Sequence, residues 1–148
     1  VADSISKQEC ISMLQNSKVF ISRSHGYENT NVSQIILGND ILTGNDIRYL
    51  NLNNVDLILF VGCFTAGTVD YGDNLLDGAI YAGAKCVIGF NASIGCDAAN
   101  FWTEQFMYYY SLGQSPEECI QSINTKLQNG TYPLEYSELM EKIVLKKN

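Results

Sequence analysis

Apolar residues along this chain form short continuous runs, which alternate with longer segments where apolar positions recur every three or four residues. The strongest run covers residues 55–61 and is apolar almost throughout. Such a run is typical of a central strand in a parallel sheet that helices cover on both faces. Residues 18–22, 34–37 and 86–90 are shorter runs and predict three more strands. Residues 141–145 predict a last strand at the end of the chain.

Capping side chains mark where the intervening helices begin. A serine stands three residues before a glutamate at Ser6 and again at Ser115, where a proline follows directly, and this is the pattern of a capping box. Thr43, three residues before an aspartate, gives a similar and shorter signal. The predicted helices cover residues 6–16, 43–50, 74–82, 98–112 and 115–128, and glycines close the last three.

Strands that alternate with helices predict an α/β class with a mostly parallel sheet, and 148 residues fit a single domain. In such sheets, sites form beyond the carboxyl ends of the strands. The only histidine, His25, follows the strand predicted at 18–22, and Cys63 follows the strand predicted at 55–61. We therefore expect both residues at the same edge of the sheet.

Charge and composition limit the classes of partner that we expect for this chain. The net charge is −7, with 46% hydrophobic and 17% charged residues and no basic cluster, so we expect no nucleic acid as partner. A cationic ligand is weakly favoured. No apolar run reaches the length of a membrane span and no leader peptide is visible, so we expect no membrane association. Because the first residue is valine, the chain is expected to be a fragment or one domain of a longer chain.

The five cysteines show no CxxC pair, and their number is odd. With a single histidine, few ligands remain for zinc, so we expect no metal and no cofactor. Cys10, Cys86 and Cys119 lie in apolar patterns and are interpreted as core residues. Cys96 is expected in a loop as an inert thiol. A reducing, cytoplasmic compartment is the simpler expectation.

His25 and Cys63 suggest a specific chemistry. A thiol becomes a strong nucleophile when an imidazole takes its proton or stabilises the thiolate. Glycines adjacent to both residues, Gly26 and Gly62, let backbone N–H groups approach a substrate carbonyl and stabilise its oxyanion. The alternative is structural: a His-Gly pair at a strand end also makes a turn, and a cysteine after a buried strand also packs.

The segments "FISRSHG", "ILTGNDIRYLNLNNVDLILFVGCFTAG" and "AIYAGAKCVIGFNASIGCDAANFWTEQFMYYYSLGQSPEECI" occur in this order. Together they resemble the CHAT-type domain, a caspase-like cysteine peptidase family related to separase and more distantly to caspases and clostripain. The resemblance covers roughly residues 2–127. It implies a caspase-like sheet with helices on both faces, a catalytic dyad of His25 and Cys63, and an oxyanion hole from the N–H groups of Gly26 and Cys63. It also implies a protein or peptide substrate, cleaved through a thioester without a metal.

The chain departs from the family pattern in two respects. A caspase-like sheet normally has a further strand before the first helix, and relatives that cleave after a basic residue often carry an acid where Val61 stands. The remaining candidates for binding a basic side chain are Asp97 first, then Asp70 and Asp73. Asp97 could instead be the N-cap of the helix expected to start at residue 98, and a loop aspartate often serves turn geometry.

Three functions remain open at this point. The first is a cysteine endopeptidase, in which His25 serves Cys63 as general base and acid. The second is an inactive caspase-like scaffold that binds protein partners, including further domains of a longer chain. The third and weakest is a nucleotide- or flavin-binding domain, because no glycine-rich phosphate loop joins a strand to a helix.

Overall fold

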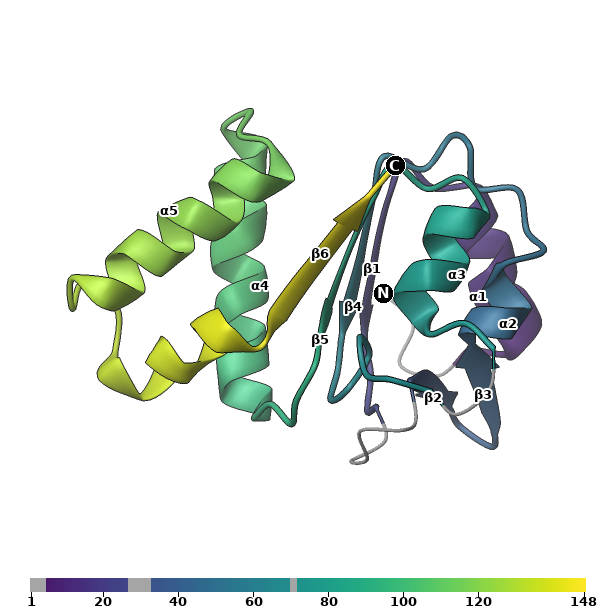
Figure 1. Ribbon diagram of the computed structural model, residues 1–148, viewed down its shortest axis with the longest axis horizontal. Coiled ribbons are helices and arrows are strands. Elements are labelled where there is room, and N and C mark those ends of the chain that lie inside the picture. Colours follow the sequence, from purple (N-terminus) through teal and green to yellow (C-terminus); the bar gives the residue numbers. More distant parts are fainter. Residues whose placement is uncertain (1–4, 27–32, 70–71) are drawn as a thin grey trace. The chain divides into compact units, whose positions relative to one another are not determined.

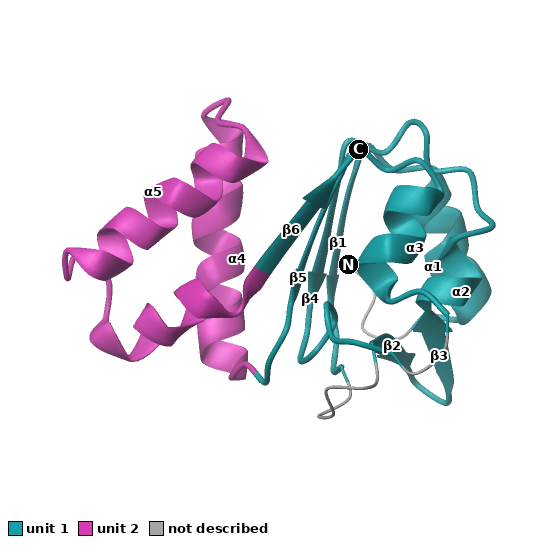
Figure 2. Cartoon of the chain, in the orientation of Figure 1, with its two compact units in different colours: residues 1–93, 144–148 teal, residues 94–143 magenta. Residues whose placement is uncertain are grey.

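The structure is a computed structural model that describes residues 5–26, 33–69 and 72–148 (Figure 1). The chain forms two compact units, residues 1–93 with 144–148 and residues 94–143 (Figure 2). The single domain expected from the chain length stays a prediction. The elements are α1 (Lys7–Gln15), β1 (Val19–Arg23), β2 (Gln34–Leu37), β3 (Asp40–Thr43), α2 (Gly44–Ile47), β4 (Leu57–Val61), α3 (Leu75–Tyr81), β5 (Cys86–Phe90), α4 (Cys96–Ser111), α5 (Pro116–Gln128), η1 (Leu134–Glu141) and β6 (Ile143–Lys147).

The first unit is built on a four-stranded sheet in the order β1-β4-β5-β6. Strand β4 pairs in parallel with β1 and with β5, which confirms the mostly parallel sheet. After β6, the N–H of Asn148 donates to the carbonyl of Lys85, which directly precedes β5, at 3.0 Å. The end of β6 therefore lies beside the start of β5, so these two strands run in opposite directions (Figure 1). The sheet is mixed and flanked by helices, and the predicted α/β class is confirmed.

Strand β4 lies in the middle of the sheet, as its apolar sequence predicts, and all five of its residues are buried. Its residues Ile58 and Phe60 belong to a continuous hydrophobic core of the first unit. Helices α1, α2 and α3 lie on one side of the sheet in Figure 1. Their apolar side chains complete the core, which includes Cys10, Leu14, Phe20, Ile47, Leu75, Leu76, Ala79 and Val87.

Beside the main sheet, β2 and β3 form an antiparallel hairpin with Gln34 opposite Thr43. The sequence pattern predicts β2 but no strand at residues 40–43. Gly38 adopts a left-handed backbone (φ 62°), which reverses the chain within two residues. Asp40, which reads as a turn residue, is the first residue of β3.

The capping patterns at Thr43 and Ser115 form complete boxes, and the one at Ser6 forms in part. The Thr43 hydroxyl accepts from the N–H of Asp46, and the Asp46 carboxylate accepts from the N–H of Thr43, at 3.3 and 2.9 Å. The box at Ser115 is complete in the same way. At Ser6 the hydroxyl accepts from the Glu9 N–H, but the glutamate bonds to that hydroxyl and not to the serine N–H.

The carboxyl of Asp46 is the most heavily bonded of these caps. Burial raises its pKa, but bonds from the Thr43 N–H and from Lys7, whose Nζ lies 3.0 Å from Oδ2, together lower the pKa below its usual value. The charged form of Asp46 therefore stabilises the start of α2.

The second unit consists of α4, α5 and η1. Trp102 and Phe106 are fully buried and stack with ring centroids 5.1 Å apart, and Tyr109 is also buried. Helix α4 begins at Cys96 with Gly95 as N-cap. The alternative interpretation of Asp97 as N-cap is therefore wrong, and so is the loop position expected for Cys96. The 3-10 helix η1 follows Pro133 without a side-chain cap, and it was not predicted from the sequence.

Candidate functional site

The candidate site lies where β1 and β4 end. In the parallel register Arg23 stands opposite Val61, so the residues after each strand leave the sheet at the same edge. The N–H of Ser24 extends the pairing by donating to the carbonyl of Val61 at 3.3 Å. The segments that carry His25 and Cys63 are therefore neighbours, as expected from a parallel sheet.

Two glycines let these segments come closer than side chains would permit. A Cβ atom on Gly26 would lie 1.9 Å from the carbonyl oxygen of Cys63 and 3.0 Å from its nitrogen. A Cβ atom on Gly62 would lie 2.6 Å from the carbonyl oxygen of Ser24. Both obstacles are backbone atoms, which a rotamer change cannot remove. Only glycine fits these positions while the two strand ends keep this arrangement.

Cys63 opens a tight turn at the end of β4. The next residue, Phe64, has a left-handed backbone (φ 54°) and is the one non-glycine residue with positive φ in the described parts of the chain. Such a conformation is uncommon for a bulky residue and persists when the surrounding structure holds it. The N–H of Phe64 donates to the carbonyl of Ala92 at 3.2 Å, and its carbonyl accepts from Gly67 at 2.8 Å. These bonds fix the residue that follows the candidate nucleophile.

Thr65, 2% exposed, ties this turn to the sheet. Its hydroxyl donates to the carbonyl of Phe60 (2.7 Å) and accepts from the N–H of Phe90 (3.0 Å), so one side chain links the ends of β4 and β5. Its carbonyl accepts from the buried hydroxyl of Ser33 at 2.6 Å, and that hydroxyl in turn accepts from the N–H of Leu75 at the start of α3. Hydrogen bonds of Thr65 therefore connect the turn that carries Cys63 to β4, to β5 and, through Ser33, to the start of α3.

The two candidate catalytic residues differ in exposure. His25 is exposed, and its carbonyl accepts from the N–H of Ile36 at 3.2 Å, which anchors the residue to β2. Cys63 is half-buried. Its Sγ lies 3.6 Å from the hydroxyl oxygen of Ser93, which follows β5. All five cysteines lie in the described part of the chain and none forms a disulfide, and Cys10, Cys86 and Cys119 are buried as expected.

The three candidate acids lie in different places. Asp73 precedes α3, and its Oδ2 lies 3.3 Å from a guanidinium nitrogen of Arg48, so this carboxylate already has a cationic partner. Asp97 is exposed in the first turn of α4, in the second unit. Asp70 lies outside the described residues. Within the first unit, the structure brings together His25, Gly26 and Cys63 but places Asp73 in an ion pair of its own.

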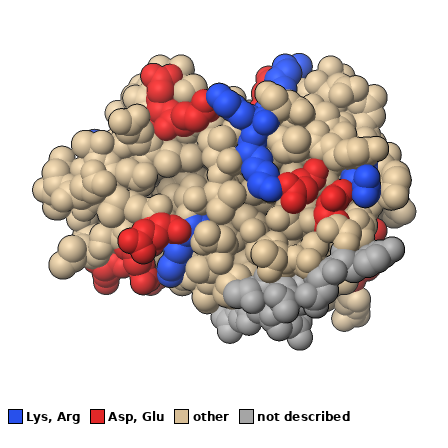
Figure 3. All heavy atoms as spheres, in the orientation of Figure 1, with Lys and Arg blue, Asp and Glu red and all other residues tan. Residues whose placement is uncertain are grey.

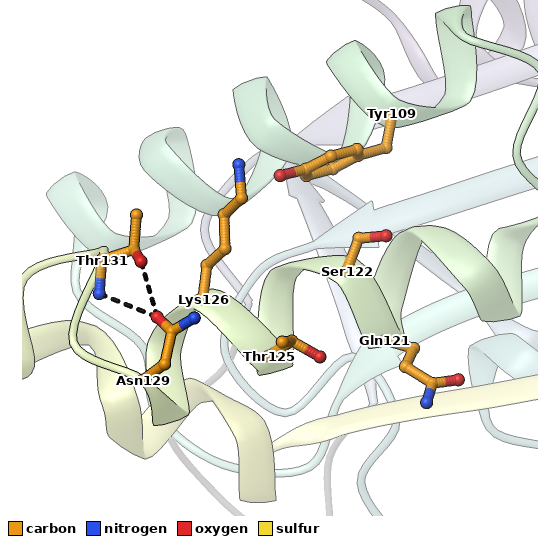
Figure 4. A pocket seen from close by; sticks show the side chains of 7 residues that line it. All are labelled: Tyr109, Gln121, Ser122, Thr125, Lys126, Asn129 and Thr131. Atoms are coloured by element: carbon orange, nitrogen blue, oxygen red, sulfur yellow. Dashed lines mark hydrogen bonds between the residues drawn. The ribbon is translucent and has the colours of Figure 1, made fainter.

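A separate hollow of about 320 Å³ lies in the second unit (Figure 4). Its lining is polar: Tyr109, Gln121, Ser122, Thr125, Lys126, Asn129 and Thr131. The Lys126 ammonium lies 5.4 Å from the centre of the Tyr109 ring, and the side-chain oxygen Oδ1 of Asn129 accepts from the N–H and hydroxyl of Thr131. Four of the seven lining residues thus already contact one another in pairs, and the sequence-predicted site residues are not part of the lining.

Charged side chains of both signs lie next to one another on the face seen in Figure 3. Ion pairs among the described residues include Lys85 with Asp56 at 2.6 Å and Lys146 with Asp77. Within residues 5–26, 33–69 and 72–148, no group of three or more His, Cys, Asp and Glu side chains could hold a metal ion. In the same part of the chain, no helix is long and apolar enough to cross a membrane.

A mixed, mostly parallel α/β sheet with a histidine and a cysteine after two adjacent strands has the arrangement of a caspase-like domain. The sequence model of the family described as CHAT domain matches residues 11–138. The chain therefore belongs to the CHAT domain family, which is related to caspase-like peptidases, and the resemblance seen in the sequence is confirmed. A comparison with curated proteins finds no match.

Sequence reasoning did not single out Ser93 or Thr65 at this edge. A usable signal existed for both residues. Thr65 is a hydroxyl residue two positions after Cys63, and Ser93 is a hydroxyl residue just beyond the next buried strand, β5. Because carboxyl ends of neighbouring parallel strands meet at one edge, a polar residue after β5 is a candidate neighbour of Cys63.

Proposed function

We propose that this domain is a cysteine endopeptidase, with Cys63 as nucleophile and His25 as general base and acid. The observation that carries the proposal is the close approach of two strand ends. The backbone of Gly26 lies against that of Cys63, and an accessible imidazole and a half-buried thiol belong to these segments. Membership in a family related to caspase-like peptidases supports the same assignment.

In this mechanism the imidazole of His25 takes the proton of the Cys63 thiol, and the thiolate attacks the carbonyl carbon of the scissile peptide bond. The oxyanion that forms accepts hydrogen bonds from the N–H groups of Gly26 and Cys63. When the intermediate collapses, the C–N bond breaks and the leaving amine takes the proton from His25. A thioester to Cys63 remains. Water, deprotonated by His25, then hydrolyses it and restores the thiol.

The absence of a side chain on Gly26 has a role in this proposal beyond turn geometry. A side chain there would collide with the carbonyl oxygen of Cys63 and push apart the two backbones whose N–H groups would bind the oxyanion. The left-handed Phe64 fixes the orientation of the peptide group that follows the nucleophile. Both features hold donors in place before substrate arrives.

The proposal includes a preference for a basic residue on the amino-terminal side of the cleaved bond, with Asp97 as the first acid to test. The exposure of Asp97 and the net charge of −7 support it. Asp73 would have to leave Arg48 to take this role. Asp70 is the third acid of the set.

The test is hydrolysis of a positional-scanning library of fluorogenic peptides by the wild type, Cys63→Ala, His25→Gln and Cys96→Ser. The last variant removes an exposed thiol from the second unit and serves as the matched control. We expect turnover that falls at least about a thousandfold in the first two variants and stays unchanged in the third. Loss of the basic preference in Asp97→Asn would support that acid as the selector.

An inactive scaffold is the competing function. It predicts that no version of the chain hydrolyses peptides. It also predicts that any labelling by a peptide-directed thiol probe does not depend on His25. A probe that labels Cys63 at the same rate in the wild type and in His25→Gln would therefore count against the dyad. Labelling that drops in this variant would support it even when no library peptide is a good substrate.

A further inference from the structure

The thiol of Cys63 has a neighbour from a third strand end. Its Sγ atom lies 3.6 Å from Oγ of Ser93, a distance at which a sulfur atom and a hydroxyl form a hydrogen bond. Ser93 comes three residues after β5 and is exposed. Three neighbouring parallel strands thus each contribute one polar side chain to the same edge: His25 after β1, Cys63 after β4 and Ser93 after β5.

The position of Ser93 is set by backbone bonds to the turn that carries Cys63. The carbonyl of Phe90 accepts from the N–H of Ala66 at 2.8 Å, and the carbonyl of Ala92 accepts from the N–H of Phe64 at 3.2 Å. The N–H of Phe90 bonds to the Thr65 hydroxyl. Residues 90–92 are therefore held against residues 64–66 along their length. The next residue, Ser93, is placed beside the thiol by the fold and not by a flexible loop.

We propose that Ser93 is a positioning residue for Cys63: its hydroxyl donates a hydrogen bond to the thiolate and holds the sulfur in the orientation for attack. This inference rests on the proposed peptidase function. A hydroxyl has one proton, and a thiolate has none to give, so the bond to the ionised sulfur runs from Ser93 to Cys63. A donor to the charged form favours that form. The proton of the thiol still goes to His25, and Ser93 keeps its own.

The test is the rate of alkylation of Cys63 by iodoacetamide as a function of pH, measured by mass spectrometry of the peptide that contains Cys63. A Cys96→Ser background removes the other exposed thiol. Cys10 and Cys119 interfere little, because burial raises the pKa of both thiols, that of Cys119 to about 11. We expect Ser93→Ala to move the midpoint of the profile to higher pH by about half a unit to one unit.

Ser93→Thr keeps the hydroxyl and should restore most of the wild-type profile. Ser111→Ala is the matched control, since Ser111 is also an exposed serine and its hydroxyl bonds to the Tyr108 carbonyl in the second unit. A midpoint that is the same in Ser93→Ala and in the wild type would overturn the inference. A midpoint shift in Ser93→Thr as large as that in Ser93→Ala would also overturn the inference, because the hydroxyl would then not be responsible for the shift.

The alkylation profile does not need peptide hydrolysis, so the two proposals can fail separately. A shifted profile in Ser93→Ala without any turnover of peptides would support the positioning role and contradict the peptidase. Peptide turnover by the wild type together with an unshifted profile in Ser93→Ala would support the peptidase and contradict the positioning role. Where peptides are cleaved, Ser93→Ala should lower kcat with little change in KM, since the hydroxyl contacts the nucleophile and not the substrate.

Discussion

Thr65→Val tests the idea that one buried hydroxyl holds the turn of Cys63 onto the sheet. Valine has nearly the same shape, so the change removes the hydroxyl without opening a cavity. The variant loses the bond accepted from Phe90 and the bond donated by the hydroxyl proton, which goes to the Phe60 carbonyl at 2.7 Å and is shared with the Gly62 carbonyl at 3.2 Å. A buried hydrogen bond contributes about 1 kcal/mol net, so we expect the free energy of unfolding to fall by about 2 kcal/mol.

For a chain of this length, a loss of that size lowers the melting temperature by about 4–8 °C. The assay needs a probe in the first unit, because Trp102, the one tryptophan of the chain, lies in the second unit and its fluorescence reports on that unit. Urea unfolding followed by far-UV circular dichroism covers the whole chain. Hydrogen exchange of the Phe90 amide reports on the hydroxyl directly, since Thr65 is its bonding partner.

Thr65→Ser is the matched control. It keeps the hydroxyl and loses one buried methyl group, worth about 1 kcal/mol, so Phe90 should stay protected from exchange. The reasoning would be refuted by a Thr65→Val protein in which the Phe90 amide exchanges as slowly as in the wild type. It would also be refuted by a serine variant that exposes this amide as much as the valine variant does.

Three further predictions concern the glycine contact and the helix caps. Gly26→Ala should lower stability by at least about 2 kcal/mol and abolish the reactivity of the candidate nucleophile, whereas Gly95→Ala, whose Cβ would meet nothing within 4 Å, should cost less than about 1 kcal/mol in urea unfolding. Ser115→Ala should destabilise the second unit by about 1 kcal/mol, seen in tryptophan fluorescence, while Ser115→Gly should cost a few tenths. The pKa of Asp46 is lowered in the folded protein, so its stabilisation is present above the unfolded pKa of about 3.9 and is lost as the pH falls through the lower folded value. Asp46→Asn should therefore show a smaller drop in melting temperature than the wild type between about pH 6 and pH 3, and an equal drop would contradict the assignment.

The elements whose signals are local could be predicted from the sequence. The apolar run of β4 and the cap at Ser115 depend on neighbouring residues alone, and both lie within two residues of their predicted places. Strand β3 could not be predicted, because its pairing with β2 depends on the left-handed Gly38 and not on its own composition. Helix α4 begins two residues before its predicted start at residue 98. Its N-cap is Gly95, which makes no side-chain capping bond, whereas Asp97 is of a residue type that commonly caps helices.

The features of the candidate site also differ in how far they can be predicted from the sequence. His25 and Cys63 could be placed at one edge from the strand pattern, since parallel strands end together. The same pattern makes Ser93 a candidate neighbour of Cys63, but the contact between its hydroxyl and Sγ depends on two backbone bonds and the bond from Phe90 to the Thr65 hydroxyl, which join the end of β5 to the turn after β4. Contacts of this kind are set by tertiary structure, and no spacing along the chain encodes them.

The roles of these residues can also be separated by what their removal does to stability. Gly26 is required by the backbone contact whether the domain cleaves peptides or only binds partners, so its loss cannot distinguish the two functions. His25 is exposed and Cys63 is half-buried, and neither belongs to the hydrophobic core of the first unit. Their replacement by alanine should change the free energy of unfolding by no more than about 0.5 kcal/mol in urea titrations. A loss of several times 0.5 kcal/mol in the free energy of unfolding of either variant would show that the residue is part of the structural framework. A near-neutral result together with lost reactivity would show that the fold holds both side chains for chemistry, because the fold itself does not need them.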